Sequence, residues 1–166
     1  MRVRAEISYP TGSPADVFDL ATSEPFRSAV CLATHALRHS VVVEHNPDGR
    51  TSVVVERTLP AQVPDAVKRF VGETITIVQT EDWGPPRADG SRQADLVIDI
   101  VGQPARMTGT VTLEAAGQGS RELVDGELKV SVPFFGKQIE PSVAEAIVAA
   151  AAVEQATGRD WLSRSS

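Results

Sequence analysis

The chain has 166 residues, a formal net charge of -6 at pH 7 and a single cysteine, Cys31. This length suits one domain with a sizeable core. The negative charge and the lack of basic runs exclude a nucleic-acid groove or a polybasic membrane patch. One cysteine excludes an internal disulfide framework and suits a reducing compartment. Because we find no apolar signal core at the start and no run of about 18 apolar residues, we expect a cytoplasmic protein without a membrane span.

The first forty residues predict a strand followed by two short helices. Apolar and polar residues alternate over residues 3–9, as in a half-buried strand. Ser13 then suits an N-cap, with Pro14 at the first helical position and Asp16 completing a capping-box pattern, so a short helix should run to about Ala21. The residues after Ser23 predict a second helix. Its apolar stripe at helical spacing comprises Phe26, Ala29, Val30, Ala33 and Leu37.

The central part of the chain predicts six strands separated by turn residues. The first two are joined by Asn46-Pro47-Asp48-Gly49, which predicts a hairpin. The connections are too short for crossovers, so the sheet should be antiparallel. The predicted strands span residues 40–45, 51–58, 73–83, 93–101, 106–115 and 121–132.

The last of these strands contains Asp125-Gly126, which suits either a two-residue hairpin turn or a bulge. We favour the bulge. An extra residue would shift the alternation, so that Leu123 could face the same side as Leu128 and Val130.

Residues 59–71, between the second and third central strands, are too apolar for an ordinary surface loop. Val63 and Val67 share a helical face with Phe70 and Val71. A short helix beginning near Pro64 could therefore close one end of a cavity like a lid. Alternatively, Phe70 simply plugs that end as part of the core.

The last thirty residues predict a long amphipathic helix. Stepping about 100° per residue from Ile139 gathers the apolar residues on one side. Small Ala146 and Ala150 either leave room beneath the helix or allow close packing on the sheet, and Glu154 is expected at a solvated rim. Pro141 allows two starts, near Phe134 with a bend or at Pro141 itself. The stripe comprises Ile139, Val143, Ala146, Ile147, Ala150, Val153, Thr157 and Trp161.

The order of these elements resembles the START-like, or helix-grip, superfamily over nearly the whole chain. The resemblance is to polyketide cyclase-like and lipid-transfer members, and within them to an actinobacterial branch of unknown function. It implies an α+β fold of residues 1–166 as a single domain, with two short N-terminal helices, a curved antiparallel sheet of six to seven strands and a long C-terminal helix across it. It also implies a cavity and no particular activity. The stretches that carry it are Ile7-Ser8-Tyr9-Pro10, Ser13-Pro14-Ala15-Asp16-Val17-Phe18-Asp19-Leu20 and Val132-Pro133-Phe134-Phe135-Gly136-Lys137-Gln138-Ile139-Glu140.

Candidate chemistry is sparse. Cys31 and His35 are four residues apart, but we expect both to point away from the helix stripe, and a structural zinc or a reactive thiolate needs more than this pair. On the third central strand, Gln79 and Glu81 share a face with apolar residues and should offer hydrogen-bonding groups near the mouth of a cavity. Glu81 is the best-placed candidate for a general base. The pattern predicts no catalytic residue, metal site or cofactor.

These patterns favour a binding protein that holds a small hydrophobic molecule, such as a lipid or polyketide, in an apolar cavity between the sheet and the last helix. The alternatives are a cyclase- or dehydratase-like enzyme using the same cavity, or a protein-partner module with a filled core. An enzyme would show at least two ionisable residues at cavity-facing strand positions. The pattern predicts no nucleic-acid partner and carries no signal for an oligomeric state. The predicted ligand-binding residues are Phe26, Val30, Phe70, Ile77, Gln79, Glu81, Ile98, Met107, Val111, Val130, Ile147, Ala150 and Val153.

Overall fold

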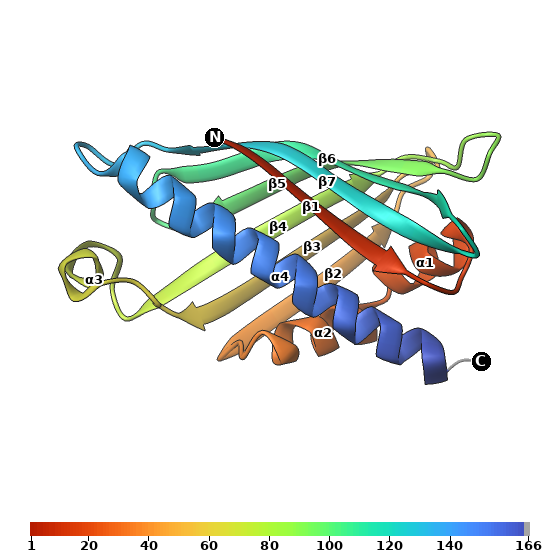
Figure 1. The fold of residues 1–166 in the computed structure, drawn as a ribbon, viewed down its shortest axis with the longest axis horizontal. Helices are drawn as coiled ribbons and strands as arrows, with labels where there is room; N and C mark the ends of the chain where they lie inside the picture. Colours follow the sequence, from red (N-terminus) through yellow and green to blue (C-terminus); the bar gives the residue numbers. More distant parts are fainter. Residues whose placement is uncertain (165–166) are drawn as a thin grey trace.

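The fold is a seven-stranded antiparallel sheet with one long helix lying across it, as predicted (Figure 1). The computed structural model describes residues 1–164, apart from the side chains of Val67 and Phe70. The strand order is β1-β7-β6-β5-β4-β3-β2. In chain order the elements are β1 (Arg2–Tyr9), α1 (Pro14–Ala21), α2 (Glu24–Ala33), β2 (Arg38–His45), β3 (Thr51–Pro60), α3 (Asp65–Val71), β4 (Thr74–Trp83), β5 (Arg92–Ile100), β6 (Ala105–Ala116), β7 (Gly119–Val130) and α4 (Gly136–Arg164).

The helix α3 lies at one end of the molecule and α1 at the other, while α2 packs along the edge of the sheet formed by β2 (Figure 1). At the start of α1, the Ser13 hydroxyl accepts a hydrogen bond from the Asp16 N–H, and the Asp16 carboxylate accepts one from the Ser13 N–H, which forms the predicted capping box. Ring contacts pack this end together. Phe18 meets Trp83 edge-on, and Phe26 meets Trp161 edge-on, both with centroids 5.8 Å apart.

The predicted stripe of α2 is wrong at its C-terminal end. The helix stops at Ala33, and His35 adopts a left-handed φ of 62°. The chain therefore leaves the helix before Leu37, whose side chain is 60% exposed.

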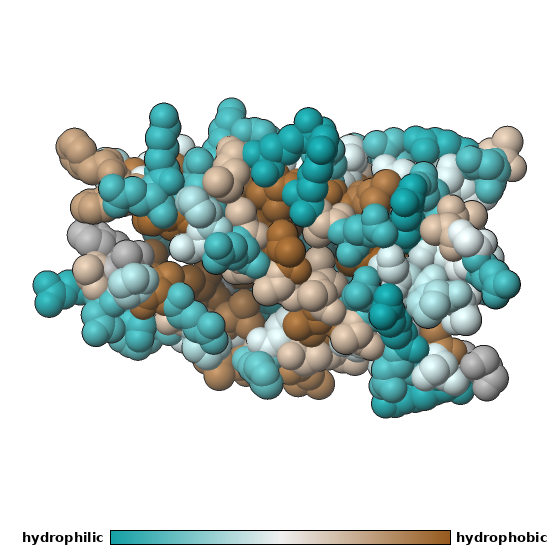
Figure 2. Space-filling model, in the orientation of Figure 1, coloured by the Kyte–Doolittle hydropathy of each residue, from teal (hydrophilic) through white to brown (hydrophobic). Residues whose placement is uncertain are grey.

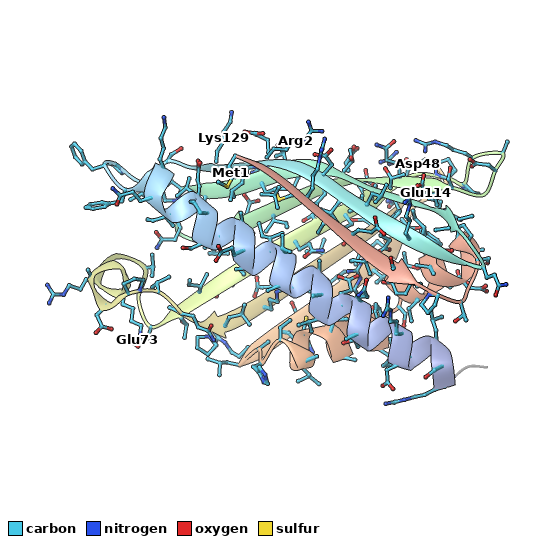
Figure 3. The ribbon with its side chains drawn as sticks, in the orientation of Figure 1. Met1, Arg2, Asp48, Glu73, Glu114 and Lys129 are labelled. Atoms are coloured by element: carbon cyan, nitrogen blue, oxygen red, sulfur yellow. The ribbon has the colours of Figure 1, made fainter. Side chains whose placement is uncertain are left out.

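The strand β7 is continuous, so the bulge and the hairpin turn predicted at Asp125-Gly126 are both wrong. Gly126 pairs with Val3 on β1 and with Gly109 on β6 without any break in register. The alternation along β7 therefore turns Glu122 and Val124 inward and Leu123 outward. Lys129, also on an outward position, points into solvent in Figure 3.

The glycines explain why turn-like residues stand inside this strand. A Cβ atom built on Gly109 would collide with the backbone of Asp125 and Gly126, and one built on Gly126 would collide with the side chain of Met107. The close approach of β6 and β7 thus requires glycine at both positions.

The helix α4 begins at Gly136, so Pro141 lies within its first turns rather than at its start. Its C-terminal half is fixed to the edge strand β1 at Ser8. The Ser8 N–H donates to Gln155 Oε1 at 2.7 Å, and Arg159 Nε donates to the Ser8 carbonyl at 3.1 Å. Among residues 1–164, no helix is long and apolar enough to cross a membrane.

Candidate functional site

A cavity of about 490 Å³ lies between the sheet and α4. Its volume falls in the range of about 300 to 1,000 Å³ that is usual for small-molecule pockets. Figure 2 shows the surface hollowed between α4 and α3, with hydrophobic residues inside the hollow. From α4 the wall receives the predicted stripe residues Ile139, Val143, Ala146, Ile147, Ala150 and Val153.

The strand register shows which residues lie at each end of the cavity. Ile75, Ile100 and Ala105 line it at the end near α3, together with residues that flank that helix, including Leu59 and Val63. These residues are apolar, and Arg57, Gln62 and Arg106 add polar groups to this part of the wall.

The inner end of the cavity carries polar groups. Glu81 on β4, Leu96 on β5 and Glu122 on β7 line it there. The next inward residues after Glu81 on β4 and after Val111 on β6 are Trp83 and Leu113, which are fully buried outside the wall and stop the cavity beneath α1. The cavity thus runs from a largely apolar opening to a closed end that contains carboxyl groups.

A buried arginine organises this closed end. Arg27, on α2, is only 3% exposed. Its Nη2 donates to Glu81 at 2.6 Å, and its Nη1 donates to Glu154 of α4 at 3.2 Å. Its Nε donates to the carbonyl of Ala21, which ends α1, at 2.6 Å. Buried charges are tolerated when they are paired in this way, so Arg27 ties helices, sheet and α4 together.

Glu81 has both carboxylate oxygens engaged. Besides Arg27, Trp83 Nε1 donates to it at 2.8 Å and Gln79 Nε2 donates at 2.7 Å. The chain itself therefore supplies three hydrogen bonds to this carboxylate. Its predicted place near the cavity mouth is wrong, because the register carries it to the closed end.

Glu122 differs from Glu81 in the partners of its carboxyl oxygens. The side chain is 2% exposed and lines the cavity, and Oε1 has no hydrogen bond among the described residues. Burial raises the pKa of Glu122 well above its usual range, and Glu154 raises it further, while Arg27 partly offsets both. The raised pKa favours the uncharged carboxylic acid form of Glu122.

Glu154 lies at the same end, and its predicted place at a solvated rim is wrong. It is buried, and burial raises its pKa, although Arg27 acts in the opposite direction. Glu154 also lines the cavity, so it combines a cavity position with a shifted pKa.

The Cys31–His35 pair does not form a reactive site. Cys31 is buried rather than turned away from the helix stripe, and burial raises the pKa of its thiol, which disfavours the thiolate. His35 is exposed. Within residues 1–164, no group of three or more His, Cys, Asp or Glu residues is placed to hold a metal ion.

Most of the predicted ligand-binding residues line the cavity. Phe26 and Val30 do not, because they are buried against other parts of the core, and Val130 is buried outside the wall. The side chain of Phe70 lies outside the described residues. The predicted residues in the wall are Ile77, Gln79, Glu81, Ile98, Met107, Val111, Ile147, Ala150 and Val153.

The residues that the sequence reasoning missed are Arg27, Glu122 and Tyr9. Arg27 lies three and four residues before the buried Val30 and Cys31, so helical spacing already placed it on the buried face. Glu122 precedes Val124 by two residues, and uninterrupted alternation would have turned it inward. Alternation along β1 predicts only that Tyr9 is an inward apolar residue. Its hydroxyl is buried near the Arg27, Glu81, Glu122 and Glu154 side chains.

Comparison with known proteins places the chain in a family. It belongs to the family DUF2505, described as "Protein of unknown function", whose model matches residues 4–162. Uncharacterized protein Rv0481c of Mycobacterium tuberculosis is 24% identical over 119 residues, which cover 70% of this chain and 68% of that protein. These relatives fit the predicted actinobacterial branch of unknown function.

Solved structures share the fold. The crystal structure of TTHA0849 from Thermus thermophilus matches with a TM-score of 0.67 and 17% identity, over 100% of this chain and 99% of that one. A STAR-related lipid transfer protein from Xanthomonas axonopodis matches with a TM-score of 0.56 and 12% identity, over 97% of this chain and 82% of that one. The predicted resemblance to the START-like superfamily is confirmed at the level of the fold.

Proposed function

We propose that residues 1–166 of this DUF2505 member form a single START-like domain that binds a small hydrophobic molecule, such as a lipid or polyketide, in the cavity beneath α4. The observation that carries the proposal is the cavity itself, which has room for a small molecule and a largely apolar outer wall. Moving apolar surface of a ligand from water onto this wall is favourable by about 25 cal/mol per Å². A lipid transfer protein among the structural neighbours is consistent with this use of the fold.

Ala150 offers a direct test, because it lines the cavity from α4. We expect Ala150→Phe to lower the affinity for the uncharged fluorescent probe N-phenyl-1-naphthylamine roughly tenfold or more, since the new ring fills space that the probe needs. The measurement is a fluorescence titration of wild type and variant, with thermal melts to establish that both are folded.

Ala156→Phe is the matched control, because Ala156 is exposed on the same helix and lies outside the cavity wall. This variant should bind the probe like the wild type. A folded Ala150→Phe protein with unchanged probe affinity would contradict ligand binding beneath α4.

A second candidate is a cyclase- or dehydratase-like enzyme, and the carboxyl groups at the closed end favour it. Glu81 and Glu122 occupy cavity-facing strand positions, and Glu154 faces the cavity from α4. With both oxygens of Glu81 engaged, Glu154 is the better candidate for a general base. Burial raises its pKa, and a raised pKa makes a carboxylate a stronger base.

This candidate predicts that the protein converts the small molecule that it retains. The retained molecule is identified by native mass spectrometry of gently purified protein, and product formation is then followed with that molecule. Under the enzyme hypothesis, Glu154→Gln lowers turnover roughly a hundredfold or more, whereas Glu145→Gln, on the exposed side of α4, has no effect. Absence of turnover by the wild type would contradict the enzyme and leave the binding protein.

A further inference from the structure

Two buried polar atoms near the closed end of the cavity lack a partner among the described residues, Oε1 of Glu122 in the cavity wall and the hydroxyl oxygen of Tyr9 behind it. Tyr9 is 1% exposed and Glu122 is 2% exposed. Buried polar atoms in proteins are nearly always hydrogen-bonded, so two such atoms in one cluster point to a polar group that the chain does not itself supply.

The two groups are held close to each other by neighbouring strands. Ile7 of β1 pairs with Glu122 of β7, and Tyr9 follows on the same inward face of β1. Glu122 raises the pKa of Tyr9, second only to burial, which reflects this proximity. A Cβ atom on Gly158 of α4 would collide with the Tyr9 ring, so the helix fixes the ring in place. Only Glu122 of the pair reaches the cavity wall.

Burial favours the protonated form of both groups. Burial is the main cause of the raised pKa of each. A carboxylic acid and a phenol can each donate and accept a hydrogen bond. A ligand hydroxyl has the same double capacity, so it can bond to such a group in either direction.

The charges around Glu122 disfavour an ionic ligand group. Arg27 already bonds both Glu81 and Glu154, and the other arginine that acts on Glu154, Arg57, lies two inward positions along β3 from the residue that pairs with Glu81. An anionic head group at Glu122 would therefore meet carboxyl groups whose nearest cation is already engaged. An ammonium group would require Glu122 to ionise, and burying that new ion pair would cost the desolvation of both partners. An uncharged polar group avoids both costs.

We propose that the closed end of the cavity selects apolar ligands that carry an uncharged hydroxyl group, and that Glu122, supported by Tyr9, forms the hydrogen-bonding site for it. This inference rests on the proposed binding function and specifies the ligand class. The apolar body of the ligand would lie along the outer wall and its hydroxyl would reach the inner end.

A matched set of bicyclic probes tests the selectivity. Naphthalene, 2-naphthol, naphthalene-2-carboxylate and 2-(aminomethyl)naphthalene share one apolar body and carry no polar group, an uncharged hydroxyl, an anion and a cation at pH 7. We expect 2-naphthol to bind tightest, roughly tenfold tighter than naphthalene, which corresponds to one or two hydrogen bonds at the inner end. Dissociation constants from fluorescence titration give the comparison.

Variants assign the effect to Glu122. We expect Glu122→Leu to abolish the advantage of 2-naphthol over naphthalene, and Glu122→Gln, which keeps an uncharged donor and acceptor, to retain it. Tyr9→Phe, which removes only the hydroxyl, should reduce the advantage and provides the test if Glu122→Leu does not fold. Glu127→Leu is the control, because Glu127 is exposed on the same strand.

Tighter binding of the carboxylate or aminomethyl probe would overturn the inference, as would an undiminished hydroxyl advantage in Glu122→Leu or, where that variant does not fold, in Tyr9→Phe. If naphthalene binds and Ala150→Phe blocks it, but 2-naphthol has no advantage, the hydroxyl site is wrong and the proposed binding function stands. If none of the four probes binds, both are wrong.

Discussion

Replacing Arg27 by methionine is expected to lower the free energy of unfolding by about 3 to 5 kcal/mol, because it leaves buried carboxylates without their cation. Glu81 and Glu154 would both lose a charged hydrogen bond, and the Ala21 carbonyl would lose its donor. Methionine fills a similar volume, so the change in the free energy of unfolding reflects the lost charge rather than a new cavity. Urea denaturation at pH 7, followed by tryptophan fluorescence, measures the difference.

Arg4→Met is the matched control. Arg4 is 66% exposed and lies 3.2 Å from Asp125 in a surface ion pair, which is worth at most about 1 kcal/mol. A second variant tests the cause. Arg27→Met combined with Glu81→Gln and Glu154→Gln removes the uncompensated charges and should recover part of the lost stability. The assignment would be contradicted if Arg27→Met cost no more than Arg4→Met.

The fold and most of the cavity wall were predictable because they depend on periodicity. Alternation along β4 placed Ile77, Gln79 and Glu81 on one face, and the helical period gathered Ile147 and Ala150 on the buried side of α4. Both patterns follow from local backbone geometry, which fixes where successive side chains point. A sheet face and a helix stripe that must be buried together then leave few possible arrangements.

The closed end of the cavity was not predictable in the same way, because it depends on partners far apart in the chain. Arg27 pairs with residues 54 and 127 positions away. The sequence alone predicts a solvent-exposed position for a carboxylate such as Glu154, because unpaired buried charges are rare and its cation is not evident from the sequence.

The error in β7 has a different cause. Asp125-Gly126 has the local composition of a turn, and this local preference competes with strand continuity. In the structure, Gly126 is needed for contact with Gly109 on the neighbouring strand, which is a tertiary requirement. Because alternation depends on continuity, this one error also concealed the inward position of Glu122.

Glu122→Gln is expected to stabilise the protein by an amount that grows with pH above about 4.5, the ordinary glutamate value. The folded pKa of Glu122 is raised, so its contribution to stability is complete below the unfolded pKa and is lost as the pH rises toward the folded pKa. Within that window the loss is about 1.4 kcal/mol per pH unit, and glutamine does not titrate. The groups whose charges act on Glu122 are Glu154, Arg27 and Glu81. Urea unfolding of wild type and variant at pH 5, 6 and 7 measures the gap.

Glu127→Gln, on the same strand, separates this effect from the general influence of pH. Glu127 is exposed, and its hydrogen bond from the N-terminal ammonium lowers its pKa, so its contribution is already complete above the ordinary glutamate value. The gap between Glu127→Gln and wild type should therefore stay constant from pH 5 to 7, whereas the gap for Glu122→Gln widens. Parallel pH curves for wild type and Glu122→Gln would mean that Glu122 is ionised in the folded protein. The closed end of the cavity would then carry a carboxylate that favours a cationic ligand group over a hydroxyl.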